Sequence, residues 1–434
     1  MSIDRRSFIK LLGASAGIGL AGAPMISVAN EIMPKKGRRV VVIGGGYGGT
    51  IAAKYIRMSD PSIEVVLVEK NKEFISCPFS NLVIAGVRDL KENVISYDKL
   101  TANHGIKLVH AEVTSIDVGG KKVVTSAGTI SYDRAVLSPG ISFRIDEIEG
   151  YDEKATPEVI PHAWKAGAQT LLLRDQLRAM KDGGVVAMAV PQSPFRCPPG
   201  PYERISMIAH YLKHNKPNSK IVVWDANEKI ASKGPLFMKG WAKHYGFDAK
   251  DASKGLIAYH SNSKIVKVDA KGMTIDNGVE TLKADVINII PPQKSGRIAF
   301  HSGVVGEDKK WCPVNQVTFE STLAPGVHVI GDSCIAGPMP KSGYAANSQA
   351  KVCALNVVQL MNGKTPIDPS HVNVCYSYIT DMEAVSVSAV YKVDKATGKT
   401  ISVPNSGGVS PDLSELEAIY ARGWIKNILG EMSS

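Results

Sequence analysis

The apolar positions of this chain of 434 residues form short runs of β-branched residues that alternate with helix-like spacings. The first run, residues 40–43, ends in a glycine-rich turn, and a helix is predicted to begin near Ile51. Continuous apolar runs of this length are typical of strands buried on both faces of a parallel sheet. A second run, residues 63–69, follows the helix, so the pattern predicts a β–α–β unit.

The turn between the first strand and the helix has the spacing G-x-G-x-x-G at Gly44, Gly46 and Gly49. In this motif one glycine allows a tight turn, one lets the backbone approach a pyrophosphate, and one lets helix and strand pack closely. Glu69 ends the second strand 25 residues after Gly44, where an acid can hydrogen-bond a ribose hydroxyl. The sequence therefore predicts a dinucleotide site at the N-terminus of the first helix.

Two later segments resemble motifs of flavoproteins built from two dinucleotide folds. Residues 132–140 are predicted to return a strand to the nucleotide domain and end at Gly140, and residues 326–332 end at Asp332, placed to bond a ribityl chain. The next helix could turn its N-terminus, with Lys341, towards the flavin pyrimidine edge. Three motifs in this order favour FAD over NAD alone. The predicted cofactor-binding residues are Gly44, Gly46, Gly49, Glu69, Cys77, Val113, Gly140, Asp332 and Lys341.

The middle of the chain repeats the strand–helix–strand pattern, with strands at 185–190 and 221–224 around a helix at 202–212. In a pyridine-nucleotide reductase, the turn after the first of these strands would carry a second G-x-G-x-x-G. Here residues 190–201 are rich in proline, which removes backbone donors and stiffens the loop. We therefore expect no NAD(P)H site in this half, and a different reductant.

These patterns predict an α/β protein with two Rossmann-like dinucleotide-binding folds, in a glutathione-reductase-like FAD/NAD(P) architecture, plus a C-terminal α+β domain. The last domain ends in a helix from about Asp412, whose apolar face is expected to pack onto the protein, with membrane contact as the alternative. The apolar residues of this helix are Leu413, Leu416, Ile419, Trp424, Ile425 and Ile428. The predicted divisions are a discontinuous FAD-binding domain at 31–150 and 293–360, a second Rossmann-like domain at 151–292, and the C-terminal domain at 361–434.

The first 30 residues have the layout of an export signal. Arg5 and Arg6 precede an apolar run at 11–23, and Ser27-Val28-Ala29 provides a small-x-small cleavage site. The arginine pair followed by Phe8 resembles a twin-arginine signal, which exports proteins already folded with a cofactor. We expect a mature periplasmic protein that begins near Asn30.

Composition and charge narrow the possible partners. The chain is 44% hydrophobic and 21% charged, as in ordinary soluble globular proteins. Removal of the signal takes away three basic residues and one acidic residue, so the net charge falls from +10 to +8. A moderately basic surface could attract an acidic protein partner, an anionic membrane or a small anion. No basic helix with interleaved aromatics points to nucleic acid, and no apolar run after residue 30 has transmembrane length.

Six cysteines are present, and an exported protein can form disulfides. Their spacing includes no Cys-x-x-Cys-His haem motif and fits no common zinc site. Cys77 lies in a polar loop before a proline, so functional and structural roles both stay open for it on this basis. Cys334 and Cys353 are expected to be core residues, whereas Cys312 is ambiguous.

Several motifs together resemble the flavoprotein subunit of flavocytochrome c sulfide dehydrogenase over essentially the whole mature chain. The most specific is Arg-Cys-Pro-Pro-Gly-Pro-Tyr-Glu at 196–203. The others lie at 44–49, 77–81, 161–167, 285–293, 311–314, 338–344 and 375–377.

The resemblance implies roles for four residues. Cys77 matches the cysteine that carries FAD through a thioether, and Cys197 and Cys375 match a redox-active disulfide beside the flavin. Glu203 matches a nearby acid that could act as a base. The implied reaction is the oxidation of sulfide to sulfur or polysulfide. Electrons would pass from FAD to a c-type cytochrome subunit, which alone would carry haem.

Two other functions stay open. A sulfide:quinone oxidoreductase shares the fold and the cysteine chemistry but would need a strongly apolar C-terminal surface. A periplasmic redox-sensing or electron-transfer flavoprotein would show negligible steady-state turnover of sulfide. A pyridine-nucleotide disulfide reductase is disfavoured, because the proline-rich turn replaces its glycine motif and no closely spaced Cys-x₄-Cys pair is present.

Overall fold

The predicted export signal lies outside the part of the chain that the structure describes. The structure is a computed structural model and describes residues 30–434. Residues 31–434 pack together as one unit, and this unit contains every predicted site residue.

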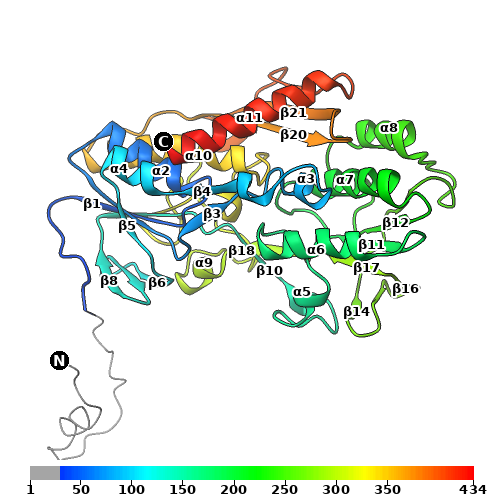
Figure 1. Cartoon of the computed structure of the whole chain (residues 1–434). Helices are drawn as coiled ribbons and strands as arrows, with labels where there is room; N and C mark the ends of the chain where they lie inside the picture. The colour runs from blue at the N-terminus through cyan, green and yellow to red at the C-terminus, as the bar shows by residue number, and fades with distance from the viewer. Residues whose placement is uncertain (1–29) are drawn as a thin grey trace, which may run out of the picture. The chain divides into compact units, whose positions relative to one another are not determined.

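A five-stranded parallel sheet in the order β19-β9-β1-β2-β5 carries the predicted nucleotide fingerprint. β1 and β5 of this sheet are labelled at the left of Figure 1. β1 (Arg39–Ile43) and β2 (Glu64–Val68) are nearly continuous runs of buried β-branched residues, and α2 (Gly49–Ser59) joins them. Val40 lies opposite Val65 in parallel register. The β–α–β unit is therefore confirmed. The other strands are β5 (Lys107–Val109), β9 (Arg134–Leu137) and β19 (Val327–Val329).

A second parallel sheet, in the order β13-β12-β11-β17, forms the other Rossmann-like half. β11 (Val185–Val190) and β12 (Lys220–Asp225) lie beside each other and are joined by α7 (Gly200–Asn215), close to the predicted bounds. β12 continues through α8 (Gly234–Tyr245) into β13 (Ile257–His260). β17 (Val286–Ile289) completes the sheet on the other side of β11.

The chain passes between the two sheets twice, through strands that pair with each other. β10 (Ile141–Phe143) leaves the first sheet, and β18 (Gln293–Ser295) returns to it. They are antiparallel, with Ile141 opposite Ser295. β19 then joins the first sheet next to β9, although the whole second sheet separates these strands in the sequence. The first nucleotide fold is therefore assembled from two distant segments.

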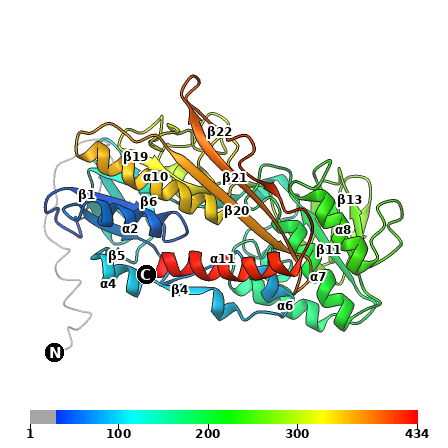
Figure 2. The ribbon, with the colours of Figure 1, turned by 90° about the horizontal axis from the view of Figure 1, so that it is seen from above.

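An antiparallel sheet and a long helix form the C-terminal part of the unit. The strands are β20 (Ser370–Tyr378), β21 (Ala384–Asp394), β22 (Lys399–Ser402) and β23 (Gly408–Val409). β20 packs against both α10 (Gly343–Met361) and α7, so it lies between the two nucleotide folds. Figure 2 shows α11 (Glu415–Ser433) lying alongside β20 and β21.

The predicted apolar face of the last helix is partly wrong. Leu416 and Ile419 are 54% and 53% exposed. The buried positions instead alternate by three and four residues, which is one stripe of an α-helix, and Leu416 and Ile419 do not belong to that stripe. Two alanines in it allow close packing against the sheet. The buried stripe is Ala418, Ala421, Ile425, Ile428 and Met432.

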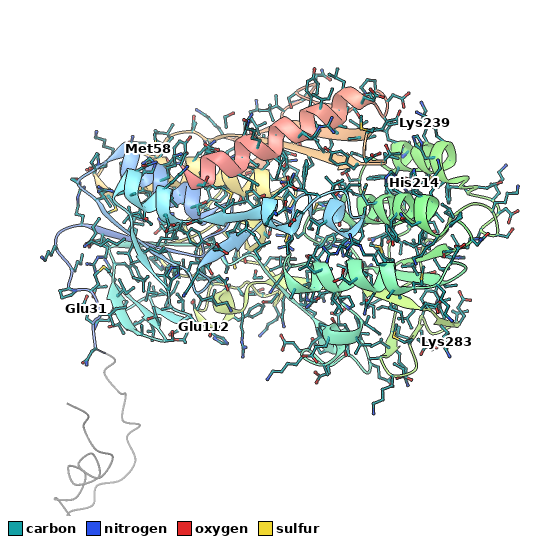
Figure 3. The ribbon with its side chains drawn as sticks, viewed as in Figure 1. Glu31, Met58, Glu112, His214, Lys239 and Lys283 are labelled. Carbon is teal, nitrogen blue, oxygen red and sulfur yellow. The ribbon has the colours of Figure 1, made fainter. Side chains whose placement is uncertain are left out.

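Charged side chains such as Lys239 on α8 and Lys283 at the end of β16 point outward (Figure 3).

Smaller elements complete the two nucleotide folds. The remaining helices are α3 (Ser80–Ile84), α4 (Asp98–His104), α5 (Thr156–Val159), α6 (Ala168–Ala179) and α9 (Arg297–His301). The remaining strands are β3 (Glu73–Ile75), β4 (Val94–Ser96), β6 (Val113–Asp117), β7 (Lys122–Thr125), β8 (Gly128–Ser131), β14 (Lys267–Asp269), β15 (Thr274–Asp276) and β16 (Thr281–Lys283).

Candidate active site

The three fingerprint glycines occupy positions with different steric demands. Gly44 has φ +99°, and a Cβ there would lie 2.4 Å from the carbonyl oxygen of Ser138. A Cβ on Gly49 would lie 1.8 Å from the carbonyl oxygen of Gly44, so helix and strand touch at this point. At Gly46 the nearest atom would be a Phe74 ring carbon at 3.5 Å. The backbone is thus closely packed at the outer glycines and open at the middle one, where a phosphate could approach.

Glu69 lies beside this turn, immediately after β2. Its Oε2 accepts a hydrogen bond of 2.8 Å from the Gly45 N–H, and its Oε1 accepts one from Asn71. This is the geometry expected for an acid that binds the ribose next to a fingerprint turn. Val113 begins β6, and its side chain packs on the core of the first nucleotide fold. The preceding residue Glu112 lies 3.8 Å from Lys70, beside Glu69, and the role of Val113 at the cofactor stays a prediction.

The segment after β19 holds an unsatisfied carboxylate. Oδ1 of Asp332 is buried and has no hydrogen-bond partner among the described residues. Burial raises the pKa of Asp332, and the charges of Arg196 and Lys341 oppose that shift. The Lys341 ammonium donates to the carbonyl oxygens of Asp332 (2.7 Å) and Cys334 (3.0 Å). Gly140 meets the same segment, since its carbonyl oxygen accepts the Ser333 hydroxyl.

The unpaired buried atoms around this segment fit a polar cofactor. Nε1 of Trp164 and Nε2 of Gln293 are also buried donors without a partner among residues 30–434. Buried polar groups in folded proteins are nearly always hydrogen-bonded, so unsatisfied groups of this kind point to a ligand. Together with the open turn at Gly46 and the acid at Glu69, they fit FAD.

Cys77 lies in the loop between β3 and α3, and its sulfur faces two N–H donors. The Arg196 guanidinium lies 3.5 Å from Sγ, and the Ala166 backbone N–H lies 3.3 Å from it. Arg196 also donates to the carbonyl oxygen of Trp164. The Cys77 thiol itself lies 3.6 Å from the same Trp164 carbonyl oxygen. Cys77 is thus a half-buried thiol in a polar environment rather than a residue of the apolar core.

Cys197 and Cys375 are brought together from two different domains. Cys197 lies in the turn after β11, with φ +57°, and its N–H donates to the carbonyl oxygen of Lys341 at 2.7 Å. Cys375 lies in the middle of β20. The two segments meet at the start of α7: Gly200 lies directly against Sγ of Cys197, and Glu203 accepts a backbone hydrogen bond from β20, the strand that carries Cys375. Burial raises the pKa of the Cys197 thiol, and the charge of Cys375 raises it further. Both are free thiols in this structure.

Gly200 explains why the turn at Cys197 is so tight. A Cβ on Gly200 would lie 2.8 Å from the Trp164 ring and 2.9 Å from Sγ of Cys197. Only glycine therefore fits at the start of α7, directly against the sulfur. The Arg-Cys-Pro-Pro-Gly motif thus sets the position of the thiol through backbone geometry.

Glu203, on the first turn of α7, is a buried carboxylate next to the cysteine pair. Its Oε1 accepts the Tyr378 backbone N–H at 2.9 Å, and its Oε2 accepts the Asn81 amide at 2.7 Å. Burial raises the pKa of Glu203, while these hydrogen bonds and the charges of Lys233 and Arg204 oppose the shift. A carboxyl with a raised pKa beside reactive thiols has the properties of a general base or acid.

Three basic residues lie around the thiols, namely Arg196, Arg204 and Lys233, and the sequence did not predict them as site residues. Arg204 is buried and donates to the carbonyl oxygens of His162 and Ala163, under the Trp164 ring. Arg196 and Arg204 are both adjacent to predicted residues, so the motif at 196–203 could have indicated them. Lys233 had no local signal, because its partners come from β20 and β21.

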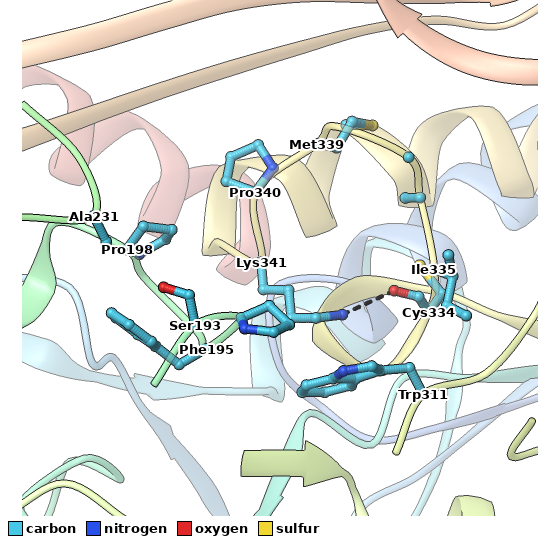
Figure 4. Close-up of a pocket in the computed structure, with 13 residues that line it drawn as sticks. Ser193, Phe195, Pro198, Ala231, Trp311, Cys334, Ile335, Met339, Pro340 and Lys341 are labelled. Atoms are coloured by element: carbon cyan, nitrogen blue, oxygen red, sulfur yellow. Dashed lines mark hydrogen bonds between the residues drawn. The ribbon is translucent and has the colours of Figure 1, made fainter. Parts of the chain in front are cut away.

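A cavity of about 310 Å³ lies between the turn after β11 and the segment that leads into α10 (Figure 4). The Lys341 side chain extends above the Trp311 ring, with Nζ 3.8 Å from the ring centre, towards the carbonyl oxygen of Cys334. Lys341 is the one charged residue in the lining. The other lining residues include Phe195, Pro198 and Met339, so the cavity is mostly apolar with one cation.

Asp225 of the second nucleotide fold corresponds to Glu69 of the first, and its carboxylate is hydrogen-bonded by side chains of the protein. Asp225 ends β12 and is fully buried. Its Oδ2 accepts hydroxyl hydrogen bonds of 2.7 Å from Tyr202 and from Tyr259. In a dinucleotide site this position would bind a ribose, so the carboxylate is engaged where a nucleotide would need it.

Comparisons with known proteins agree with this arrangement. The family model "Sulfide dehydrogenase [flavocytochrome c] flavoprotein chain, central" matches residues 170–291. "Flavocytochrome c sulphide dehydrogenase, flavin-binding" matches residues 367–432, and "Pyridine nucleotide-disulphide oxidoreductase" matches residues 38–171. The three models follow the order of the first nucleotide fold, the second one and the C-terminal part.

Two curated relatives are named as enzymes that act on sulfide. The flavoprotein chain of sulfide dehydrogenase from Chlorobaculum thiosulfatiphilum is 61% identical over 46 residues, which are 11% of this chain and 96% of that sequence. The mitochondrial sulfide:quinone oxidoreductase of Mus musculus is 22% identical over 345 residues, or 76% of this chain and 72% of the relative.

Among solved structures, the sulfide:quinone oxidoreductase of Aquifex aeolicus superposes with a TM-score of 0.73 at 17% identity and covers 91% of both chains. At this identity the likeness shows the fold, which is that of the FAD/NAD(P) oxidoreductases predicted from the two nucleotide units. The family models and the Chlorobaculum relative go further. The chain belongs to the flavoprotein chains of flavocytochrome c sulfide dehydrogenase, and it is a flavin-dependent oxidoreductase.

Proposed function

We propose that this enzyme oxidises sulfide through a disulfide between Cys197 and Cys375. The observation that carries the proposal is that Glu203, on the first turn of α7 close to Sγ of Cys197, hydrogen-bonds β20, the strand that carries Cys375, so both thiols lie at one buried carboxylate. Hydrosulfide attacks one sulfur of the disulfide, a new S–S bond forms as the old one breaks, and the products are a persulfide and a thiolate. The charge of the hydrosulfide ends on the thiolate, so atoms and charge balance.

Glu203 handles the proton in this reaction. A carboxylate at this position can accept a proton from H₂S or from the persulfide, and burial raises its pKa towards the range where such transfer is efficient. The hydrogen bonds from Asn81 and from the Tyr378 backbone hold the carboxylate in place.

FAD would be held by residues of the first nucleotide fold. The turn at Gly44, Gly46 and Gly49 and the acid Glu69 would bind the nucleotide end, and Asp332 the ribityl chain. Cys77 would hold the cofactor covalently, as its contacts with Arg196 and Ala166 support. When bound, FAD accepts two electrons from a donor and can release them one at a time.

We assign the electron acceptor to a c-type cytochrome subunit. The Chlorobaculum thiosulfatiphilum relative is named as the flavoprotein chain of a flavocytochrome c, and this sequence has no Cys-x-x-Cys-His motif of its own. A periplasmic location, with export through the twin-arginine signal at Arg5 and Arg6, fits such a partner. No helix within residues 30–434 has the length and apolar content to cross a bilayer.

A quinone is the second candidate acceptor. It is favoured by the fold, which this chain shares over 91% of its length with the sulfide:quinone oxidoreductase of Aquifex aeolicus. It is also favoured by two exposed apolar side chains on α11, Leu416 and Ile419. An assay of sulfide-reduced enzyme with a soluble c-type cytochrome, and separately with decylubiquinone, distinguishes the two. Faster reoxidation by cytochrome is expected, and turnover with the quinone alone would replace the proposed acceptor.

The test of the reductant is an anaerobic titration of the FAD-loaded enzyme, followed by its flavin absorption band. Stoichiometric sulfide should bleach the flavin and NADH should not. Cys197→Ser should lose the bleaching by sulfide but keep FAD. Cys353→Ala, at a buried core position in α10, is the matched control and should behave like the wild type. Normal sulfide turnover in Cys197→Ser would refute the disulfide mechanism.

A further inference from the structure

Lys233 is a buried lysine that the proposed chemistry does not yet use. It directly precedes α8 in the left-handed backbone region, at φ +58°, and is only 5% exposed. Lys239, on the same helix, points into solvent and pairs with Asp412 at 2.6 Å (Figure 3). The left-handed region is uncommon for residues other than glycine.

The Lys233 ammonium is held by neutral acceptors on the strands around Cys375. Nζ donates to the Ser377 hydroxyl at 2.9 Å and to the carbonyl oxygens of Cys375 at 3.2 Å and Val385 at 3.4 Å. These contacts use all three N–H groups, which favours the protonated form. No carboxylate among the described residues lies within ion-pair distance of Nζ.

Ionisable groups from four directions face Lys233. Burial lowers its pKa to about 8, and the negative charges of Cys375, Glu203, Cys197 and Glu417 act in the opposite sense. These groups come from β20, α7, the turn after β11 and α11. The positive charge lowers the pKa of Cys375 and of Cys197 against the effect of burial. Lys233 is therefore electrostatically coupled to both thiols.

We propose that Lys233 is a positioning residue for sulfide oxidation: through its contacts with β20, its ammonium stabilises the negative charge left on the cysteine pair when hydrosulfide opens the disulfide. The proposal rests on the disulfide chemistry given above. That step brings one negative charge into a buried site, where an uncompensated thiolate is unfavourable. A fixed ammonium supplies the compensation without any movement of the protein.

The expected effect follows from the loss of one nearby charge. An opposite charge at close range changes a pKa by about one unit or more, which is about a tenfold change in the thiolate fraction below the pKa. Lys233→Met should therefore raise the pH midpoint for thiolate formation by about one unit or more. Lys233→Arg keeps the charge and should lie close to the wild type. Lys239→Met is the matched control and should show no change.

The experiment uses the full-length, FAD-loaded protein after reduction with a dithiol under anaerobic conditions. The rate at which iodoacetamide alkylates Cys197 and Cys375 is measured across pH by peptide mass spectrometry. Lys233→Asn serves as a second neutral variant, because asparagine tolerates the left-handed backbone at this position. Thermal unfolding checks that each variant is folded, since a purely structural role would lower stability without moving the alkylation midpoint.

The outcomes separate this proposal from the proposed function. A folded Lys233→Met or Lys233→Asn variant with the wild-type alkylation midpoint overturns the role of Lys233. Wild-type enzyme whose flavin is not bleached by sulfide overturns the disulfide chemistry instead. The alkylation profile is measured on the dithiol form, so it still reports whether Lys233 acts on the thiols. In a sulfide-reactive enzyme, Lys233→Met should also slow the bleaching of flavin by about tenfold.

Discussion

Protonation of His162 should lower the free energy of unfolding of this protein at acid pH, and His162→Asn should remove that part of the loss. The imidazole is buried beside the candidate active site, and its Nδ1 accepts the Trp164 backbone N–H at 3.0 Å. Burial, together with the charges of Lys165, Arg204 and Arg196, lowers the pKa of His162 to about 3. Asparagine offers a carbonyl oxygen to the same N–H but does not titrate.

The direction of the effect follows from proton binding. The pKa in the folded protein lies below the unfolded value of 6.5, so between these values the unfolded chain binds the proton more strongly. The contribution of the neutral, buried His162 to the free energy of unfolding is therefore fully present above about pH 6.5, and it is lost as the pH falls from there towards the folded pKa. At about pH 5 the solution lies about 1.5 pH units below the unfolded pKa. Each unit costs about 1.4 kcal/mol, so the free energy of unfolding falls by about 2 kcal/mol.

The assay is guanidinium unfolding of the FAD-loaded protein at about pH 7 and about pH 5, followed by tryptophan fluorescence. The wild type should lose about 2 kcal/mol more than His162→Asn between these conditions. His214→Asn, at an exposed position near the end of α7, is the matched control and should lose as much as the wild type. Equal losses in the wild type and His162→Asn would refute the reasoning.

Three further changes test other parts of the site. Gly49→Ala should abolish FAD binding, measured by absorption after gel filtration, because its Cβ would lie 1.8 Å from a backbone oxygen; retained flavin would contradict this. Cys77→Ser should leave FAD that acid precipitation releases, whereas flavin fluorescence that stays with the denatured variant would exclude attachment at Cys77. Glu203→Gln should place an amide donor against Asn81 and lower the free energy of unfolding by about 1–3 kcal/mol; an unchanged unfolding midpoint would argue against the hydrogen bond.

Local patterns were sufficient to predict most of the scaffold. The apolar runs at β1, β2, β11 and β12 must be buried on both faces, and the spacing of glycines after β1 allows few alternatives. The last helix shows the limit of this approach. Its apolar residues form more than one stripe, and only packing against β20 and β21 selects the alanine-containing stripe that is buried.

The sequence by itself determined the two nucleotide folds, the candidate FAD fingerprint and the cysteines worth testing, because these depend on neighbouring residues and on recognisable motifs. Only the tertiary structure decided which ionisable groups share the site. Lys233 and Cys375 lie 142 positions apart and meet because α8 begins against β20. Their interaction depends on distance and burial, and neither quantity is encoded near either residue.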